Sequence, residues 1–389
     1  MGIFNNLFDI DSRDNYAVTG LNKELNSLYI YNYFIKNKKN NLVITNSLYE
    51  ANDVYNRLLN YTNKVLFFPM DDFITSEVTD ISPEFVIDRL TTLNKLLGSG
   101  KYIVVTNLMG ILRYLPNTKL YKNKIIDINK DMDIDRDDFI NKLFDLGYEK
   151  KPVVSRTGEM AIRGYVIDIF PIEFDNPIRI EFWGDTIDSI KYFDLEDQIS
   201  NTSIDSVKIY PYTEFLIDGK IEDNIIRKQK YLLNYSDSVS GLWDYVSDSV
   251  IFYYDYNQII NSYSLLRENI LEYDSELDDD IKTNYMWDIE DISNKHNIYI
   301  LDIDNLIDLD VNNKKYVSHS IENYCGIFEK LKLDLIRYIK SGKTVILCVD
   351  DRNVVKRIVT YLELDDIIFT DENNIINNKI NFVNKYIYG

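Results

Sequence analysis

The chain has 389 residues, with 63 Asp and Glu against 43 Lys and Arg and a formal net charge of −20. Hydrophobic residues make up 45% and aromatic residues 13%, which is typical of folded rather than disordered proteins. This length predicts two or three domains with enough chain for a sizeable core. Because so acidic a surface repels phosphate backbones, we expect no tight DNA binding by this chain alone, and a protein as its partner.

Metal and membrane chemistry have little support in the sequence. The two cysteines, Cys325 and Cys348, form no zinc-binding spacing with the two histidines, His296 and His319. The first 15 residues lack the basic region and apolar core of a signal peptide, and no apolar run approaches membrane length. The sequence therefore predicts a cytoplasmic protein with no metal site and no membrane contact.

The first 116 residues alternate between strand-like and helix-like segments. Short apolar runs at Leu42–Thr45, Val65–Phe68 and Ile103–Thr106 are typical of buried parallel strands. Between the last two runs, Ser82 and Pro83 are expected to begin a helix. This alternation predicts an open α/β sheet, such as a RecA-like nucleotide-binding fold.

In such a fold a phosphate loop follows the first strand. Compared with the motif GxxxxGK[ST], Gly20 and Ser27 match, whereas Leu25 replaces the second glycine and Asn26 replaces the lysine. The leucine narrows the approach to the phosphates, and the asparagine cannot neutralise their charge. The segment is either a degenerate phosphate loop or an ordinary turn that never bound nucleotide.

A β-meander is predicted further along the chain. Its strands are Arg163–Phe170, Ile178–Trp183 and Thr186–Phe193, with a tight turn at Gly184 and Asp185. In the middle strand, apolar residues at 178, 180 and 182 alternate with Arg179, Glu181 and Trp183, so the two sets lie on opposite faces.

The polar face of this strand has two interpretations. Arg and Trp on a sheet surface are frequent anchors for a binding partner. Alternatively, Trp183 packs under a neighbouring loop and Arg179 pairs with Glu181.

The meander resembles a known family. The order RGxxxDIFP, then PxRIEFxGDxIDSI, is similar to the UvrB-like module of nucleotide excision repair, and most similar to its version at the N-terminus of transcription-repair coupling factors. Upstream, Phe67-Phe68-Pro69, Ser82-Pro83 and Arg89-Leu90 follow the same family's order. The resemblance covers about residues 10–215.

The resemblance implies a non-catalytic module that recruits the repair protein UvrA to stalled transcription. The family positions that contact UvrA match Arg163, Arg179 and Trp183. In these families UvrB keeps the complete phosphate loop, whereas the coupling-factor module has lost it. The residues at 20 and 25–27 therefore favour a coupling-factor module. The alternative is a UvrB-like ATP-dependent protein that recognises DNA damage. A secondary role in autoinhibiting the family's DNA-translocating motor is also implied.

The resemblance further implies which ligands lie outside this chain. No DExH box or intact Walker motif occurs here, so we expect no cofactor in this chain, and ATP and Mg only in the motor of the full-length family. RNA polymerase and DNA are expected to bind only family domains absent here. The chain is therefore expected to be an N-terminal fragment or a truncated relative.

The expected domains are a split RecA-like domain (1–118 and 211–305), an inserted UvrA-binding domain (119–210), a linker (306–317) and a small α/β domain (318–389). Strands at Val250–Tyr254 and Ile298–Asp302 are expected to extend the first sheet. The small domain should contain a helix, Ile327–Ile339, then a strand, Thr344–Val349, then a helix, Asn353–Leu362. The triplet GKT at 342–344 precedes its strand, so we expect a turn there and no nucleotide site.

Overall fold

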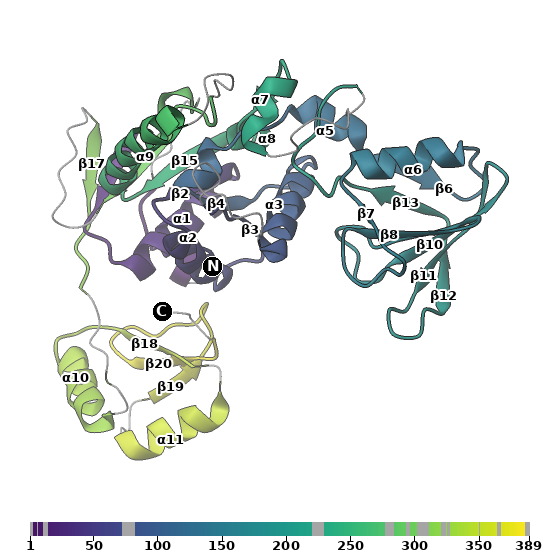
Figure 1. The fold of residues 1–389 in the computed structure, drawn as a ribbon. Coiled ribbons are helices and arrows are strands. Elements are labelled where there is room, and N and C mark those ends of the chain that lie inside the picture. Colours follow the sequence, from purple (N-terminus) through teal and green to yellow (C-terminus); the bar gives the residue numbers. More distant parts are fainter. Residues whose placement is uncertain are drawn as a thin grey trace.

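The structure is a computed structural model of residues 1–389. It describes residues 3–5, 7–10, 15–71, 82–219, 229–276, 284–292, 296–301, 311–319, 324, 327–349, 351–363 and 367–385. Three parts are visible in Figure 1: a large α/β unit, a sheet with one long helix at its side, and a small α/β unit that contains the last strands.

The largest sheet is seven-stranded and all of its pairs are parallel, in the order β17-β1-β16-β15-β2-β4-β3. The strands are β1 (Tyr16–Thr19), β2 (Asn40–Thr45), β3 (Val65–Phe68), β4 (Ile103–Asn107), β15 (Ser249–Tyr254), β16 (Asn297–Leu301) and β17 (Asn312–Lys315). The late strands β15 and β16 lie between β1 and β2, so distant parts of the chain complete one sheet. The predicted α/β class with a large parallel sheet is confirmed.

Both faces of this sheet are covered by helices, as continuous apolar strands require. Val43 faces one core together with residues of α1 (Lys23–Asn37) and α2 (Leu48–Leu59). Leu42 and Ile44 face the other. That second core receives side chains from the helices α3 (Pro83–Leu96), α4 (Leu108–Leu112), α8 (Leu242–Tyr245) and α9 (Tyr256–Glu276).

Short elements connect these layers. They are the 3-10 helices η1 (Ile3–Asn5), η2 (Gln229–Tyr231) and η3 (Ile289–Asp291), the helices α5 (Thr118–Lys124) and α7 (Leu232–Tyr235), and the paired strands β5 (Leu115–Pro116) and β14 (Val239–Ser240).

The middle of the chain forms a six-stranded sheet in the order β12-β11-β10-β9-β8-β7. Its strands are β7 (Glu149–Lys150), β8 (Glu159–Arg163), β9 (Val166–Ile169), β10 (Ile178–Trp183), β11 (Thr186–Phe193) and β12 (Ser200–Ile204). A two-stranded sheet of β6 (Ile126–Asn129) and β13 (Ser206–Ile209) accompanies it. The helix α6 (Arg136–Asp145) contributes Phe139 and Leu143 to the core that it shares with Ile178 and Ile180.

Two expectations about strands need correction. The run Arg163–Phe170 is not one strand, because Gly164, with φ of +58°, and Tyr165 reverse the chain between β8 and β9. Residues 312–315, which the sequence places in a linker, form the edge strand β17 beside β1. The rest of that expected linker before residue 311 lies outside the described residues, and the division of the chain into domains stays a prediction.

The small C-terminal unit has a parallel sheet in the order β18-β20-β19, formed by β18 (Val345–Cys348), β19 (Ile367–Thr370) and β20 (Ile380–Val383). Its helices are α10 (Phe328–Lys340) and α11 (Arg352–Leu362). Residues 342–344 form the turn into β18, as predicted. Among the described helices of the whole chain, none is both long and apolar enough to cross a membrane.

A buried ion-pair triad connects the large unit to the segment that leaves the inserted sheet. Glu214 follows β13, and its carboxylate accepts from Arg89 Nε of α3 at 2.8 Å and from Arg113 Nη2 at 2.7 Å. All three side chains are at most 4% exposed. Burial opposes ionisation of Glu214, but the two guanidiniums outweigh it and lower the pKa of its carboxyl to about 2.

We expect Glu214→Gln to destabilise the chain by about 3–5 kcal/mol at neutral pH, because the variant leaves two buried guanidiniums without their anion. Asp138→Asn is the matched control, since Asp138 pairs with Lys142 at 2.7 Å on an exposed helix surface and should contribute at most about 1 kcal/mol. Urea unfolding of both variants measures the difference.

The same pair of proteins provides a pH test. The folded-state pKa of Glu214 lies below its unfolded value, so its stabilisation is present above about pH 4.5 and is lost as the pH falls towards 2. The stability gap between wild type and Glu214→Gln should therefore shrink over this interval. A gap that stays constant contradicts an ionised Glu214.

Candidate functional site

The candidate site lies on the outer face of the inserted sheet, where three strands meet. The turn at Gly164 brings β8 beside β9, and the register of β9 and β10 places Asp168 opposite Arg179. Arg163 lies at the end of β8, within reach of the same carboxylate. The structure thus brings together two of the three residues predicted from the sequence, around an aspartate that the sequence analysis did not select.

Asp168 is fully buried, and both of its oxygens accept hydrogen bonds from guanidinium groups. Arg179 donates from Nε to Oδ1 at 2.7 Å and from Nη2 to Oδ2 at 3.0 Å. Arg163 donates from Nη2 to Oδ2. The bidentate contact with Asp168 fixes the plane of the Arg179 guanidinium. The same hydrogen bonding raises the pKa of Arg179.

Arg179 is largely enclosed by contacts within its own sheet. Its side chain is only 16% exposed, its Nη1 donates to the carbonyl of Gln198 at 3.1 Å and to Ser200 Oγ at 3.3 Å, and its guanidinium lies 4.7 Å from the ring centroid of Phe193. It therefore connects β9, β10 and the start of β12. A buried carboxylate thus holds Arg179 inward.

The other residues of the face are more accessible. Trp183 is 82% exposed at the end of β10, beside the turn at Gly184, so it does not pack under a loop. The Arg163 side chain is 46% exposed. Glu181 pairs with Lys191 at 2.8 Å and accepts from Ser189 Oγ at 2.5 Å, and these hydrogen bonds lower its pKa. The alternative pairing of Arg179 with Glu181 is therefore not the one that forms.

Sequence reasoning missed Tyr165, a second exposed aromatic residue on this unit. It is 66% exposed in the turn between β8 and β9, and its carbonyl accepts from the backbone N–H of Phe182 in β10. The sequence predicts a single strand over Arg163–Phe170, so sequence reasoning did not recognise Tyr165 as a turn residue. Its position in a turn is evident only when this run is divided into β8 and β9.

Stability distinguishes the two arginines. We expect Arg179→Ala to cost about 3 kcal/mol, because it removes two hydrogen bonds from a buried carboxylate, and Arg163→Ala to cost about 1 kcal/mol. Arg267→Ala is a control for loss of a surface guanidinium, because Arg267 and its partner Asp288 are 54% and 52% exposed. Chemical unfolding of the three variants measures this order, and equal losses for Arg179 and Arg267 contradict it.

The predicted phosphate-loop residues extend from the end of β1 into helix α1. Gly20 has φ of +81°, and α1 begins at Lys23 with Asn22 as its N-cap, accepting from Leu25 N–H at 3.0 Å. Leu25, Asn26 and Ser27 are thus helical, and Asn26 and Ser27 are buried. Only residues 20–22 remain as loop, which is too short to wrap around phosphate groups.

The chain itself occupies the space at this loop. Ser318 Oγ accepts from the backbone N–H of Asn22 at 2.9 Å and donates to the carbonyl of Gly20 at 2.8 Å. The Tyr316 N–H donates to the Thr19 carbonyl at 2.9 Å. A Cβ placed on Gly20 would lie 2.0 Å from the Tyr316 carbonyl oxygen, so this contact itself demands glycine. A serine hydroxyl therefore uses a loop N–H that a phosphate oxygen would need.

Carboxylates surround the same edge of the sheet. Glu24 and Asp53 both pair with Arg57, at 2.9 and 3.0 Å, which leaves that guanidinium neutralised. Burial raises the pKa of Glu50, with the nearby Asp255 adding to the shift. Within the described residues no group of three or more His, Cys, Asp or Glu could hold a metal ion.

The comparisons with known proteins agree with the sequence resemblance. Residues 126–215, which run from β6 past Glu214, match the family model described as the UvrB interaction domain. The resemblance to the UvrB-like module is thereby confirmed. The chain is 35% identical over 220 residues to the transcription-repair-coupling factor of Staphylococcus haemolyticus, covering 56% of this chain and 19% of that protein.

Two further relatives give the same result. The transcription-repair-coupling factor of Staphylococcus epidermidis is 32% identical over 235 residues, which cover 60% of this chain and 20% of the relative. That of Staphylococcus aureus is 33% identical over 220 residues, covering 56% and 19%. The matched segment thus spans about a fifth of the curated relatives' length.

Proposed function

We propose that this chain is a non-catalytic part of a transcription-repair coupling factor and recruits UvrA through the outer face of β8–β10. The observation that carries the proposal is the 82% exposure of the Trp183 indole on a sheet whose neighbouring cations are held in fixed positions. A large exposed aromatic side chain on a rigid strand is the usual form of a binding anchor. The match of residues 126–215 to the UvrB interaction domain supports a protein partner.

The three predicted residues then have different roles. Trp183 is proposed to supply the apolar contact and Arg163 a cation for a UvrA carboxylate, since half of its side chain is accessible. Arg179 is proposed to hold Asp168 and the meander in the binding geometry. Because Asp168 orders Arg163 before any partner arrives, less conformational entropy is lost on binding.

UvrA titration tests the site. We expect Trp183→Ala to weaken binding about thirtyfold, equivalent to about 2 kcal/mol, while its melting temperature stays that of wild type. Tyr49→Ala is the matched control, because Tyr49 on α2 is 81% exposed in the large unit and should leave UvrA affinity unchanged.

Two results would argue against the assignment. Normal UvrA binding by both Trp183→Ala and Arg163→Ala removes the proposed face. Equal losses for Trp183→Ala and Tyr49→Ala indicate a general surface effect. Arg179→Ala is expected to lose UvrA binding in proportion to its loss of stability. This variant alone therefore does not test whether the face contacts UvrA.

We also propose that the large unit neither binds nor hydrolyses ATP, which separates it from a UvrB-like enzyme. Support comes from Leu25 and Asn26 in place of the motif residues, and from Ser318, which already bonds the loop. Cytoplasmic location, and contacts of RNA polymerase and DNA with other parts of a longer protein, remain proposals from the family resemblance. We propose autoinhibition as a second use of the same exposed face, since another domain can cover Trp183.

Restoring the motif should not restore nucleotide binding. We expect neither wild type nor the double variant Leu25→Gly/Asn26→Lys to bind a fluorescent ATP analogue with Mg²⁺, because residues 316–318 still fill the loop. Saturable binding tighter than roughly 100 μM, about −5.5 kcal/mol, by either protein would falsify this proposal.

A further inference from the structure

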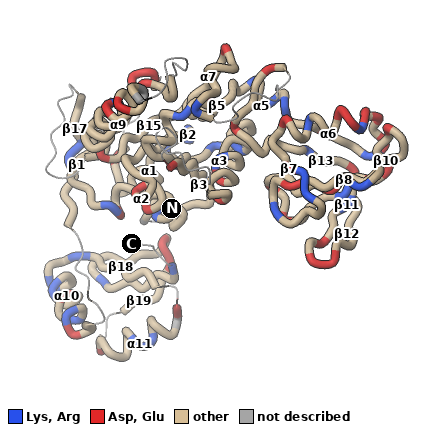
Figure 2. The backbone as a smooth tube through the Cα atoms, in the orientation of Figure 1, with Lys and Arg blue, Asp and Glu red and all other residues tan. Residues whose placement is uncertain are grey.

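The helices of the C-terminal unit form a basic surface on an acidic protein. α10 carries four Lys and Arg against two Asp and Glu, and α11 carries three Lys and Arg and no acidic residue. Figure 2 marks these charges on the two helices. The whole chain has a net charge of −20, so this local excess of cations is opposite in sign to the rest of the surface.

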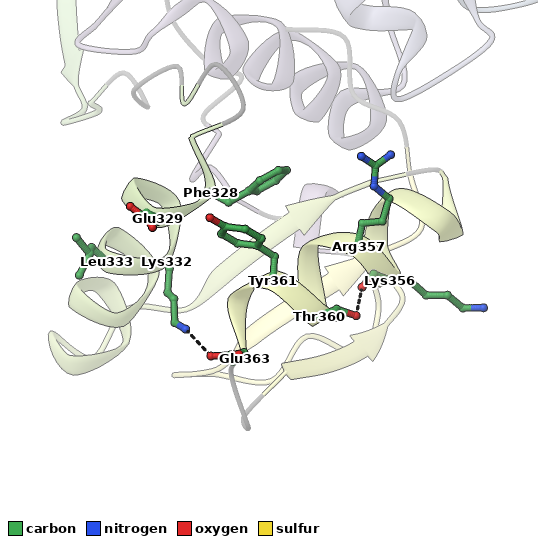
Figure 3. Close-up of a pocket in the computed structure, with 9 residues that line it drawn as sticks. All are labelled: Phe328, Glu329, Lys332, Leu333, Lys356, Arg357, Thr360, Tyr361 and Glu363. Carbon is green, nitrogen blue, oxygen red and sulfur yellow. Dashed lines mark hydrogen bonds and ion pairs between the residues drawn. The ribbon is translucent and has the colours of Figure 1, made fainter.

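A groove of about 1020 Å³ lies along these helices. The rings of Phe328 and Tyr361 form its apolar wall, with centroids 5.2 Å apart, and Leu333, 69% exposed, lies farther along α10. Figure 3 shows the two rings between the helices. The exposed residues Ile327, directly before α10, and Val354, on α11, add apolar surface to this unit.

The cations at this groove differ in whether they have an anion of their own. Lys332 pairs with Glu363 at 3.4 Å across the two helices, as the dashed line in Figure 3 marks. Lys356 and Arg357, which also line the groove, form no ion pair with any residue in the described ranges of the chain. Both cations come from α11, the helix that also contributes Tyr361 to the groove.

We propose that this groove binds an acidic segment of another protein that presents apolar side chains. Leucine-sized groups would cover Phe328, Leu333 and Tyr361, and carboxylates would meet Lys356 and Arg357. The complementary charges would speed association and set orientation, while apolar burial would provide most of the affinity.

A nucleic acid fits this groove less well. Every nucleotide carries a phosphate, so a nucleic acid could not keep its charges away from Glu329 and Glu363, whereas a peptide can place apolar side chains beside them. The apolar side chain of Leu333 offers a base neither stacking nor hydrogen bonds.

The experiment uses the full chain and a fluorescent synthetic helix with Leu at positions i, i+4 and i+7 and Glu between them. Anisotropy should show saturable micromolar binding, weakened at least tenfold by Lys356→Glu/Arg357→Glu and by Tyr361→Ser. The matched control is Lys119→Glu/Lys122→Glu, which makes the same charge change on the exposed surface of α5. Thermal melts check that each variant folds.

Peptide and oligonucleotide probes separate the alternatives. Replacing the peptide's leucines with Ser, or its glutamates with Lys, should abolish binding. Absence of binding by the original peptide, or equal weakening by the α5 control, overturns the proposal. So does tighter binding of a single-stranded oligonucleotide that depends on Lys356 and Arg357. Sedimentation that shows self-association lost in Lys356→Glu/Arg357→Glu overturns it in favour of a second copy of the chain.

Discussion

The position of the inserted sheet depends on a single carboxylate. Glu214 leaves β13 and lies between Arg89 of α3 and Arg113, which follows α4. Arg89 also donates to the carbonyl of Pro69, beyond β3, at 3.1 Å. Three segments of the large unit are thus bonded through one buried group on the returning chain. Because an unpaired charge is very costly at this depth, the segment has few alternative positions.

The same arrangement recurs on the outer face of the inserted sheet with a different result. Asp168, like Glu214, is a buried carboxylate between two guanidiniums. In the first triad both arginines are buried, so the arrangement is purely structural. In the second, Arg163 is half-exposed, so part of the buried network reaches the surface. Burial of the shared anion is what gives the exposed cation a fixed position.

The sequence predicted best those strands whose pattern of apolar side chains shows directly which residues are buried. β3, β10 and β11 have the predicted bounds because apolar runs or strict alternation mark them. The edge strand β17, with the sequence NNKK, has no such signal. One edge of this strand faces solvent, and polar residues there prevent it from pairing with a strand of another molecule. Its strand character depends on β1, which is almost 300 residues away in the sequence.

The candidate site shows a similar limit. Parity in β10 placed Arg179 and Trp183 on one face, but it could not show which of them is held by a partner. That information was in Asp168, an acidic residue within an apolar strand, which is rarely buried without a cation. Recognising the need for a counter-charge would have identified Arg179 as a candidate partner of Asp168. The pairing itself required the register between β9 and β10.

Counter-charges also separate the surfaces that can accept a partner from those that cannot. Arg57 is held by Glu24 and Asp53, and Ser318 bonds the loop beside Gly20, so the polar groups at this edge of the large sheet are paired within the chain. Lys356 and Arg357 have no internal anion among the described residues, although the chain has an excess of carboxylates. In a protein of this charge, cations left without an anion beside apolar side chains define the surface most complementary to an acidic partner.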